Sequence, residues 1–554
     1  MRSTGKQRVI NRSVAQIDPY RIELITDYLL DGESRASRQR FRTDMYLFVP
    51  IQSGINPENY PINKFYQDVS LRLRIREPNV GFRALFAAED SMLRRLMMTV
   101  ETATQNPSRF DAQAFADEIK FVGCSFVTFF VKRIARAKIR AALSIQMLSG
   151  LNQDEKEKLV GRPFRHIWRA YKILHSWRQL IYGTVLTKLQ VNEQLRLDIQ
   201  AVDEYCSFRF RDGLAELSQI LAMLGQSLEP TRFTWWQRRL RAHIRLEHFH
   251  CQKRGLLWID DRSSPYDLER FMMRRGQVKK NVQQVLYLDM RSQPLFTLRQ
   301  QVGAMLAAAM AGMWALFAQM LILRHSQADL NTENMLSTGT FVLFTALTLA
   351  YVLKDRIKEV GRHRLKKGLL SSLPDTHESI RMRTSQGDNV EVGALQESAK
   401  FIPWRSIPED AQNALRGKFK DPGLQDVVFY RKQVQFHYSK LKKVREPVTA
   451  IHDILRLDLR RFCKNLDVPQ RSAHFLRLNG DAASLAIPKV YHLEILFIFS
   501  TLQNRRHRPI HKDLLRIVIT QDGIVRMEEV KKHRNKPIRG RPLEVKLSDI
   551  IKAS

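Results

Sequence analysis

The sequence predicts a membrane protein of mixed α+β class, with a two-helix transmembrane hairpin between a mainly helical N-terminal cytosolic domain and a smaller α+β C-terminal cytosolic domain. The hairpin is predicted by two uncharged runs, residues 302–323 and 335–353, which hold 22 and 19 residues. Helical periodicity between residues 85 and 295 predicts the first domain, and strand-like segments after residue 400 predict the second.

The chain is long enough for several cores and carries a large positive charge. With 554 residues, 44% of them hydrophobic, it is expected to form three or four units of roughly 100–200 residues. Its mean hydropathy of −0.33 is typical of a soluble protein, so the membrane part is a small insert. The net charge of +35 is compatible with nucleic acid, anionic lipid or an acidic partner.

Changes in composition divide the chain into five parts. They are an N-terminal segment with β-hairpin-like strands at 1–84, a helical cytosolic domain at 85–295, a transmembrane helical hairpin with a basic juxtamembrane helix at 296–368, a linker at 369–399, and an α+β cytosolic domain with a basic C-terminal tail at 400–554. In the first part, the apolar segment Met45–Pro50 and the alternating segment Val69–Glu77 are predicted strands that would pair, the second with an arginine-lined outer face.

One segment of the predicted helical domain allows two structural interpretations. Helices are predicted at 89–101, 112–148, 154–199 and 215–224 from their apolar periodicity. In Thr234–His248, tryptophans and arginines alternate at helical spacing, as in helices that lie on a membrane surface. An amphipathic helix packed on the domain's own core has the same pattern, and we expect this second arrangement.

His243, Glu247 and Cys251 are a candidate metal-ligand set. Their i, i+4, i+8 spacing would place all three on one helix face, and all three side-chain types can bind zinc. The spacing matches no known metal motif, so we expect ordinary packing and no metal.

Both uncharged runs are long enough to cross the roughly 30 Å core of a bilayer, since a helix rises about 1.5 Å per residue. The excess of Lys and Arg after the second run places that end on the cytoplasmic side, with both termini inside. Contact with anionic lipid is predicted for seven residues that follow the second run: Lys354, Arg356, Lys358, Arg362, Arg364, Lys366 and Lys367.

Small residues predict close packing of the two membrane helices. Ala304, Ala308 and Gly312 recur at four-residue spacing in the first run, as do Ala346 and Ala350 in the second. They would pack within one hairpin or between the protomers of a homodimer. Neither run contains a charged side chain, which favours an anchor over an ion pathway. The remaining alternative is that the two uncharged runs form a buried helical hairpin of a soluble protein.

The C-terminal part is predicted to begin with a polar linker and to end in strands. Strands are expected at 426–438 and 490–501, a helix at 447–466, and a hairpin of 514–520 with 524–530 around Gln521-Asp522-Gly523. A second turn is expected at Asn479-Gly480-Asp481. The basic clusters 504–512 and 531–541 lack the aromatic side chains on which single-stranded nucleic acid normally stacks.

The sequence contains no local signature of catalysis. We find no GxGxxG, GxxxxGK[ST], GxSxG or HExxH motif. The four cysteines, Cys124, Cys206, Cys251 and Cys463, are scattered, which is typical of free thiols in a reducing compartment. The basic N-terminus lacks the apolar segment of a signal peptide. We therefore expect a protein that is not an enzyme and has no cofactor.

The resulting hypothesis is a scaffold, sensor or signalling protein of the inner membrane with two spans. Its partners would be membrane lipids, a second copy of the chain through the membrane helices, and an unknown protein. A membrane-tethered nucleic-acid binder, an oligomerising effector that disrupts membranes, and an enzyme with an unrecognised site are the alternatives.

Overall fold

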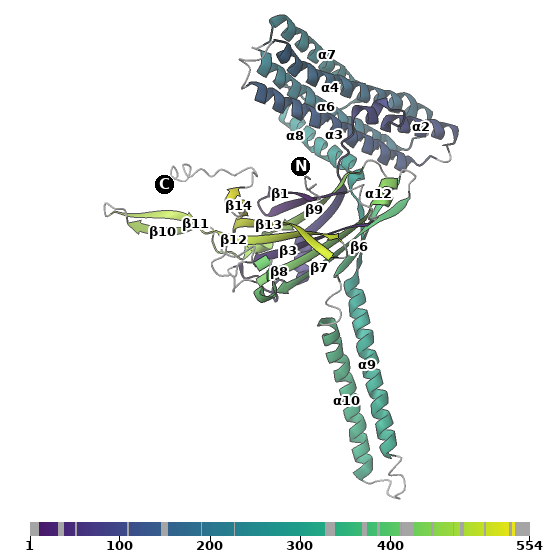
Figure 1. The fold of residues 1–554 in the computed structure, drawn as a ribbon, viewed down its shortest axis with the longest axis vertical. Helices are drawn as coiled ribbons and strands as arrows, with labels where there is room; N and C mark the ends of the chain where they lie inside the picture. Colours follow the sequence, from purple (N-terminus) through teal and green to yellow (C-terminus); the bar gives the residue numbers. More distant parts are fainter. Residues whose placement is uncertain are drawn as a thin grey trace, which may run out of the picture.

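Strands from both ends of the chain form one β domain in the computed structural model (Figure 1). The structure describes residues 10–30, 38–49, 53–107, 110–145, 153–189, 191–225, 228–326, 338–367, 374–384, 388–409, 411–412, 426–444, 448–468, 470–476, 481–503, 506–530 and 535–537. In these ranges the chain is a mixture of helices and antiparallel strands, which confirms the predicted α+β class.

The larger sheet has nine strands in the order β15-β14-β13-β12-β3-β8-β7-β6-β5. Here β3 (Arg38–Val49), from the N-terminal part, lies between β12 (Tyr491–Gln503) and β8 (Asp426–His437). The other strands are β5 (Asp289–Pro294), β6 (Thr376–Arg383), β7 (Asn389–Ile402), β13 (Arg506–Thr520), β14 (Gly523–Val530) and β15 (Asn535–Pro537). Strands from the parts predicted at 1–84 and 400–554 therefore belong to the same sheet.

The smaller sheet also combines the two ends of the chain. Its order is β1-β2-β9-β4, so β9 (Ala450–Asp458) pairs with both β2 (Arg21–Leu29) and β4 (Val69–Ile75). The first strand, β1, comprises Ile10–Asp18. The strands predicted near residues 45 and 69 are confirmed, but they lie in different sheets and do not pair with each other.

The two sheets enclose a core that a buried polar pair divides into two clusters. The rings of Tyr28 on β2 and Phe41 on β3 stack with their centroids 4.6 Å apart. Between the clusters, Lys432 forms an ion pair with Asp453, which also accepts a hydrogen bond from the Tyr28 hydroxyl at 2.7 Å. Burying these charges is tolerable because each has a partner of opposite charge or a hydrogen bond.

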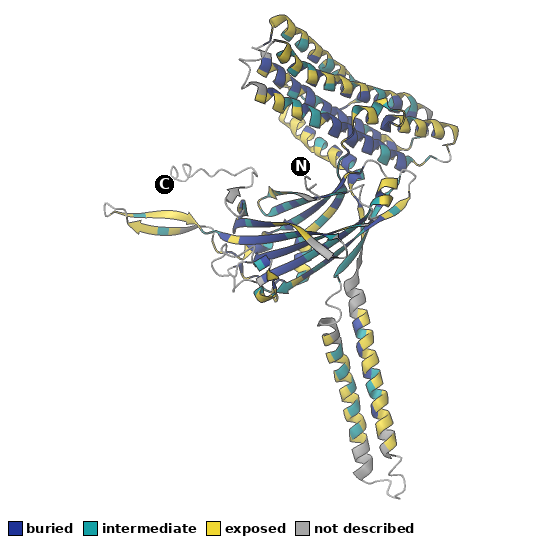
Figure 2. Ribbon diagram, in the orientation of Figure 1, coloured by how far each residue is buried: buried dark blue, intermediate teal, exposed yellow. Residues whose placement is uncertain are grey.

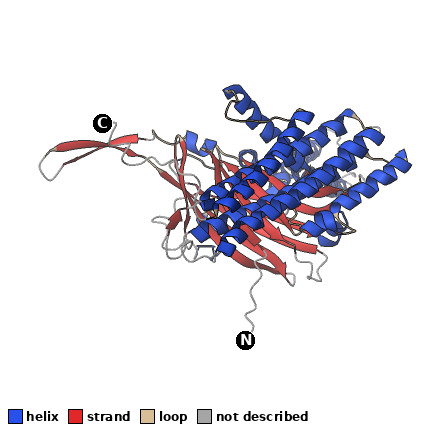
Figure 3. Ribbon diagram, turned by 90° about the horizontal axis from the view of Figure 1, so that it is seen from above, coloured by secondary structure: helices blue, strands red, loops and turns tan. Residues whose placement is uncertain are grey.

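A helical domain is inserted between β4 and β5 and lies over the sheets (Figure 3). Its long helices are α2 (Met92–Gln105), α3 (Ala112–Ile145), α4 (Gln153–Leu180), α6 (Glu193–Gly225), α7 (Pro230–Arg254) and α8 (Pro265–Gln283). The chain leaves and re-enters the β domain at adjacent points, since the Leu288 amide donates to the Leu73 carbonyl at 2.9 Å. The predicted helix at 154–199 is interrupted. After α4 come a π-helical turn at Ile181–Val185 and the short helix α5 (Leu186–Lys188), and α6 begins at Glu193.

Two predictions for the C-terminal part are wrong. The expected linker 369–399 contains β6 and most of β7. The helix expected at 447–466 is β9 followed by a short helix, α13 (Arg460–Lys464). In β9, Leu455 faces the larger sheet while Ile454 is buried on the opposite face. A strand that is buried on both faces has apolar residues at spacings that resemble a helix.

The remaining strands follow the sequence pattern. Strands are present at both predicted positions, 426–438 and 490–501, and the predicted hairpin is formed by β13 and β14, with Thr520 opposite Gly523. A further hairpin, β10 (Gln470–Leu476) with β11 (Ala482–Pro488), projects from the body in Figure 3. Asn479 and Gly480, of the turn predicted there, lie outside the described residues.

Candidate membrane-binding hairpin

Two long helices stand away from the β domain as a hairpin (Figure 1). They are α9 (Leu295–Ser326) and α10 (Thr338–Lys367). Figure 2 shows that most described residues of α9 are exposed. Large apolar side chains line the side of α9 opposite its buried alanines, including Met305, Met313, Leu316 and Met320, which are 71%, 64%, 68% and 74% exposed. Exposed apolar surface of this extent is rare in soluble monomers and needs a covering phase or partner.

Only one described helix is long and apolar enough to cross a membrane. It is the stretch Gln301–Leu321 of α9, which has a mean hydropathy of 1.6 and is mostly not buried within the protein. The described part of α10 does not meet the same requirement of length and apolar composition. The predicted pair of spans is therefore not supported; residues 335–337 of the second run lie outside the described ranges.

The packing of the helices offsets their apolar runs. A Cβ placed on Gly361 of α10 would lie 3.5 Å from the Ala307 Cβ of α9. The helices are antiparallel, so counting eight residues from this contact toward the tip of the hairpin leads to Leu353 on α10 and to Ala315 on α9. These two residues therefore lie opposite each other. The uncharged runs therefore face each other only over 315–323 of α9, a layer of about 13 Å. This is about half of the roughly 30 Å core of a bilayer.

The contact stripe of α9 is displaced from the predicted one. Its buried small residues include Ala307, Ala311 and Ala318. Of the predicted stripe, Ala304 and Gly312 are half-buried and Ala308 is exposed. A Cβ on Gly312 would meet nothing within 4 Å, so Gly312 is not a close-packing position. The side that faces α10 is thus one residue along from the stripe that the four-residue spacing indicates.

Ala346 and Ala350 are half-buried in α10, while the neighbouring Leu347 and Leu349 are exposed. Small residues therefore contribute to the face of α10 that meets α9 within one chain.

The basic residues expected to contact lipid extend α10 beyond its apolar part. The Lys354 ammonium lies 4.9 Å from the centre of the Tyr351 ring. Arg356 forms an exposed ion pair with Glu359 at 3.3 Å, which contributes little to stability because water screens it. Lys358 and Arg364 are exposed. The side chains of Arg362, Lys366 and Lys367 lie outside the described residues.

The helix predicted at Thr234–His248 is part of α7 and packs on the helical core. Leu240 is buried, and the rings of Trp236 and Phe164 lie 4.4 Å apart, whereas Trp235 is 44% exposed. A membrane-surface helix would instead expose its whole apolar face.

The arginine-lined face of β4 is only partly solvated, because Arg72 is exposed and Arg74 is half-buried.

Of His243, Glu247 and Cys251, the last two share a contact with the Ser207 hydroxyl, while His243 lies against a tyrosine ring. His243 lies against the Tyr171 ring, with centroids 5.5 Å apart, and burial lowers its pKa. Arg178 donates two hydrogen bonds of 2.9 Å to the Glu247 carboxylate. Cys251 is buried, with its sulfur 3.4 Å from the Ser207 hydroxyl. Among the described residues no group of three or more metal-ligating side chains is present.

The Arg178–Glu247 pair belongs to a buried network that the sequence pattern does not indicate. Arg178 also donates to Asp203 at 2.9 Å, and Asp203 is bonded to Tyr182 at 2.7 Å and to His250 at 2.8 Å. Burial opposes ionisation of Asp203, but Arg178 and these hydrogen bonds outweigh it and lower the pKa to about 2. The network joins α4, α6 and α7 and serves to hold them together.

The basic clusters are only partly described. Residues 506–512 belong to β13, and of 531–541 only Asn535–Pro537, in β15, is described.

No protein-family model, no curated protein and no solved structure matches the chain. We take the hairpin as the candidate site, because α9 exposes large apolar side chains along its length.

Proposed function

We propose that the protein is a membrane-anchored, non-enzymatic scaffold or sensor, in which the α9–α10 hairpin enters a bilayer and holds the β domain and the helical domain on the cytosolic side. The observation that carries this proposal is the exposure of Met305, Met313, Leu316 and Met320 on a helix that stands away from the body. Burial of such side chains in hydrocarbon stabilises the inserted state by roughly 1.5–3 kcal/mol each.

The offset between the helices gives them different roles in the bilayer. Helix α9 supplies most of the apolar surface, while the basic half of α10 lies beside the first half of the α9 run. We assign residues 315–323 of α9 to the hydrocarbon core. Lys354, Lys358 and Arg364, with the part of α9 that lies beside them, are assigned to the cytosolic headgroups. Each such cation near an anionic surface contributes about 1 kcal/mol. A thin shared apolar layer is accommodated by local thinning of the bilayer or by tilt.

Flotation of the purified full-length chain with vesicles tests the anchor. We expect wild type to float, and the variant Met313→Asp with Leu316→Asp to remain largely at the bottom of the gradient. Met272→Asp is the matched control, because Met272 is 65% exposed on α8, far from the hairpin. Equal flotation of all three proteins would sink the proposal.

A second candidate function is an oligomerising membrane-disrupting effector. The observation in its favour is the part of α9 that precedes the shared apolar layer 315–323. There Met305 and Leu306 are exposed beside the basic half of α10. A second copy of the chain would cover these side chains. Release of a trapped dye from vesicles that contain the protein would favour the effector. Stable flotation without leakage would favour the passive anchor.

A further inference from the structure

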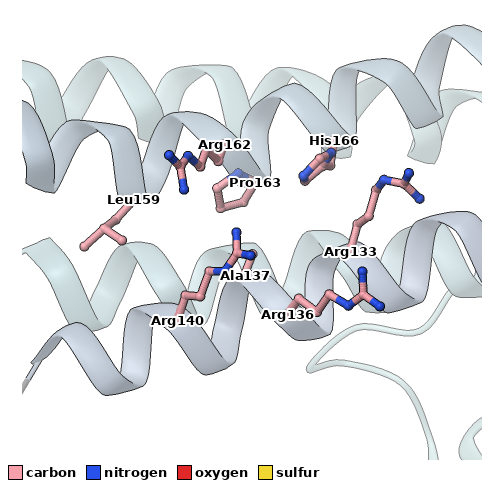
Figure 4. Close-up of a pocket in the computed structure, with 8 residues that line it drawn as sticks. All are labelled: Arg133, Arg136, Ala137, Arg140, Leu159, Arg162, Pro163 and His166. Atoms are coloured by element: carbon pink, nitrogen blue, oxygen red, sulfur yellow. The ribbon is translucent and has the colours of Figure 1, made fainter. Parts of the chain in front are cut away.

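A small cavity lined by arginines lies between α3 and α4 in the helical domain (Figure 4). Its volume is about 180 Å³. The lining residues are Arg133, Arg136, Ala137 and Arg140 from α3, and Leu159, Arg162, Pro163 and His166 from α4. Each helix contributes residues at i, i+3, i+4 and i+7, which form one face of a helix. The cavity is therefore built by the facing sides of two packed helices, where apolar residues would normally meet.

The positive charge of this arginine pocket is not neutralised by the protein. Within the ranges that the structure describes, none of its four guanidinium groups forms an ion pair with a carboxylate. Arg133 donates to the Phe129 carbonyl at 3.2 Å and lies over the Phe129 ring. The nearby Glu157 is paired with Arg232 at 3.1 Å, outside the pocket. Arg178 in the same bundle, by contrast, has two carboxylate partners.

The pocket also contains an unsatisfied polar atom and the electrostatic effects of crowded cations. The Nδ1 atom of His166 is buried and has no hydrogen-bond partner. Burial, followed by the positive charges of Arg133 and Arg169, lowers the pKa of His166 to about 4. Burial, then Arg136 and Arg169, also lower the pKa of Arg133. Both pKa shifts show that burial and the neighbouring arginines disfavour positive charge at His166 and Arg133.

We propose that this arginine pocket binds a compact phosphate group, as inorganic phosphate or diphosphate or as the terminal phosphates of a soluble molecule. Planar guanidinium groups match phosphate oxygens with paired hydrogen bonds. The volume of about 180 Å³ is below the roughly 300–1,000 Å³ typical of sites for drug-sized ligands, so the pocket suits the phosphate itself.

The position of the pocket favours a soluble phosphate over a lipid headgroup. The helical domain lies on the side of the β domain opposite to the α9–α10 hairpin in Figure 1. A bilayer that holds the hairpin is then on the far side of the molecule from α3 and α4. The site does not depend on membrane insertion, so the two proposals can fail separately.

Calorimetric titration of the full-length protein in detergent with inorganic diphosphate tests the site. We expect binding by wild type and binding about tenfold to 100-fold weaker in Arg136→Gln and Arg162→Gln, because each loses a charge-assisted contact. Both residues are exposed at the pocket rim, so the variants should fold. Arg238→Gln, an exposed arginine on α7, is the matched control and should bind as wild type does.

Two further measurements separate the possible outcomes. Diphosphate should raise the melting temperature of wild type and of Arg238→Gln but not of the pocket variants. In a second experiment, nanodiscs of phosphatidylcholine, with or without phosphatidic acid, replace the detergent. If wild type binds phosphatidic acid discs more tightly than the pocket variants do, and diphosphate does not bind, the phosphate belongs to a lipid headgroup. If neither diphosphate nor phosphatidic acid distinguishes the pocket variants from Arg238→Gln, the pocket is not a phosphate site.

Discussion

Gly361 of α10 lies against Ala307 of α9, so close that a Cβ on Gly361 would be 3.5 Å from the Ala307 Cβ. This contact sets the register of the hairpin. It places the basic half of one helix beside the apolar half of the other, which the apolar runs taken separately do not indicate.

The register predicts a specific cross-link. The Cβ separation of 3.5 Å lies in the range of disulfides, so Ala307→Cys with Gly361→Cys should oxidise readily to an intramolecular bridge. The four native cysteines are buried and should not compete. Mobility on non-reducing gels and mass spectrometry of peptides would detect the bridge.

The control pairs Gly312→Cys with Gly361→Cys, because a side chain on Gly312 would have nothing within 4 Å. Equal cross-linking of both pairs, in membranes as in detergent, would show that the hairpin has no fixed register.

The buried network predicts a large effect of one carboxylate on stability. Glu247→Ala removes both hydrogen bonds of 2.9 Å and leaves part of the Arg178 charge without its partner. Breaking a buried ion pair from one side typically costs about 3–5 kcal/mol. Chemical denaturation of the helical domain should show a loss of this order.

The matched variant is Glu157→Ala, which removes the half-exposed partner of Arg232 at 3.1 Å. A surface pair of this kind contributes about 1 kcal/mol or less. A loss from Glu247→Ala no larger than that from Glu157→Ala would contradict a structural role for the network.

Two glycines in the helical domain should respond oppositely to the same substitution. A Cβ on Gly213 of α6 would lie 2.3 Å from the ring of Phe130, which is fully buried and cannot move aside. Gly213→Ala should therefore destabilise by roughly 1–3 kcal/mol through overpacking. Gly276 of α8 has nothing within 4 Å, and Gly276→Ala should stabilise by about 0.5–1 kcal/mol. Thermal melts that move in the same direction would refute this packing.

His166 predicts a pH dependence of stability. Its pKa is lowered from 6.5 to about 4, so the unfolded chain binds a proton below about pH 6.5 that the folded protein does not accept. Its contribution to stability is therefore full above pH 6.5 and falls as the pH decreases towards 4. His166→Asn should show a smaller loss of stability between pH 7 and pH 4.5 than wild type.

Replacement of an exposed histidine, His474→Asn on β10, should leave the pH profile unchanged. Diphosphate should flatten the wild-type profile, because an anion near the arginines makes protonation of His166 less unfavourable. Identical profiles for wild type and His166→Asn would count against the low pKa.

Local patterns predicted the elements better than their partners. The Gln521-Asp522-Gly523 turn specifies a hairpin of neighbouring segments, and that hairpin is present. Pairing of β3 with β12 and β8 joins residues several hundred positions apart, and no local signal encodes such a contact. The arginines of the pocket lie on two helices, and in each helix alone they look like an ordinary solvated face.

By itself, the sequence determined the mixed α+β class, the long helices and the apolar run that becomes α9, because these depend on periodicity and composition within short windows. The tertiary structure alone decided that both chain ends form one β domain, that Gly361 meets Ala307, and that Arg136 and Arg162 share one cavity. The physical reason is that strand register, helix register and uncompensated charge are properties of packed pairs, which form only when distant segments meet.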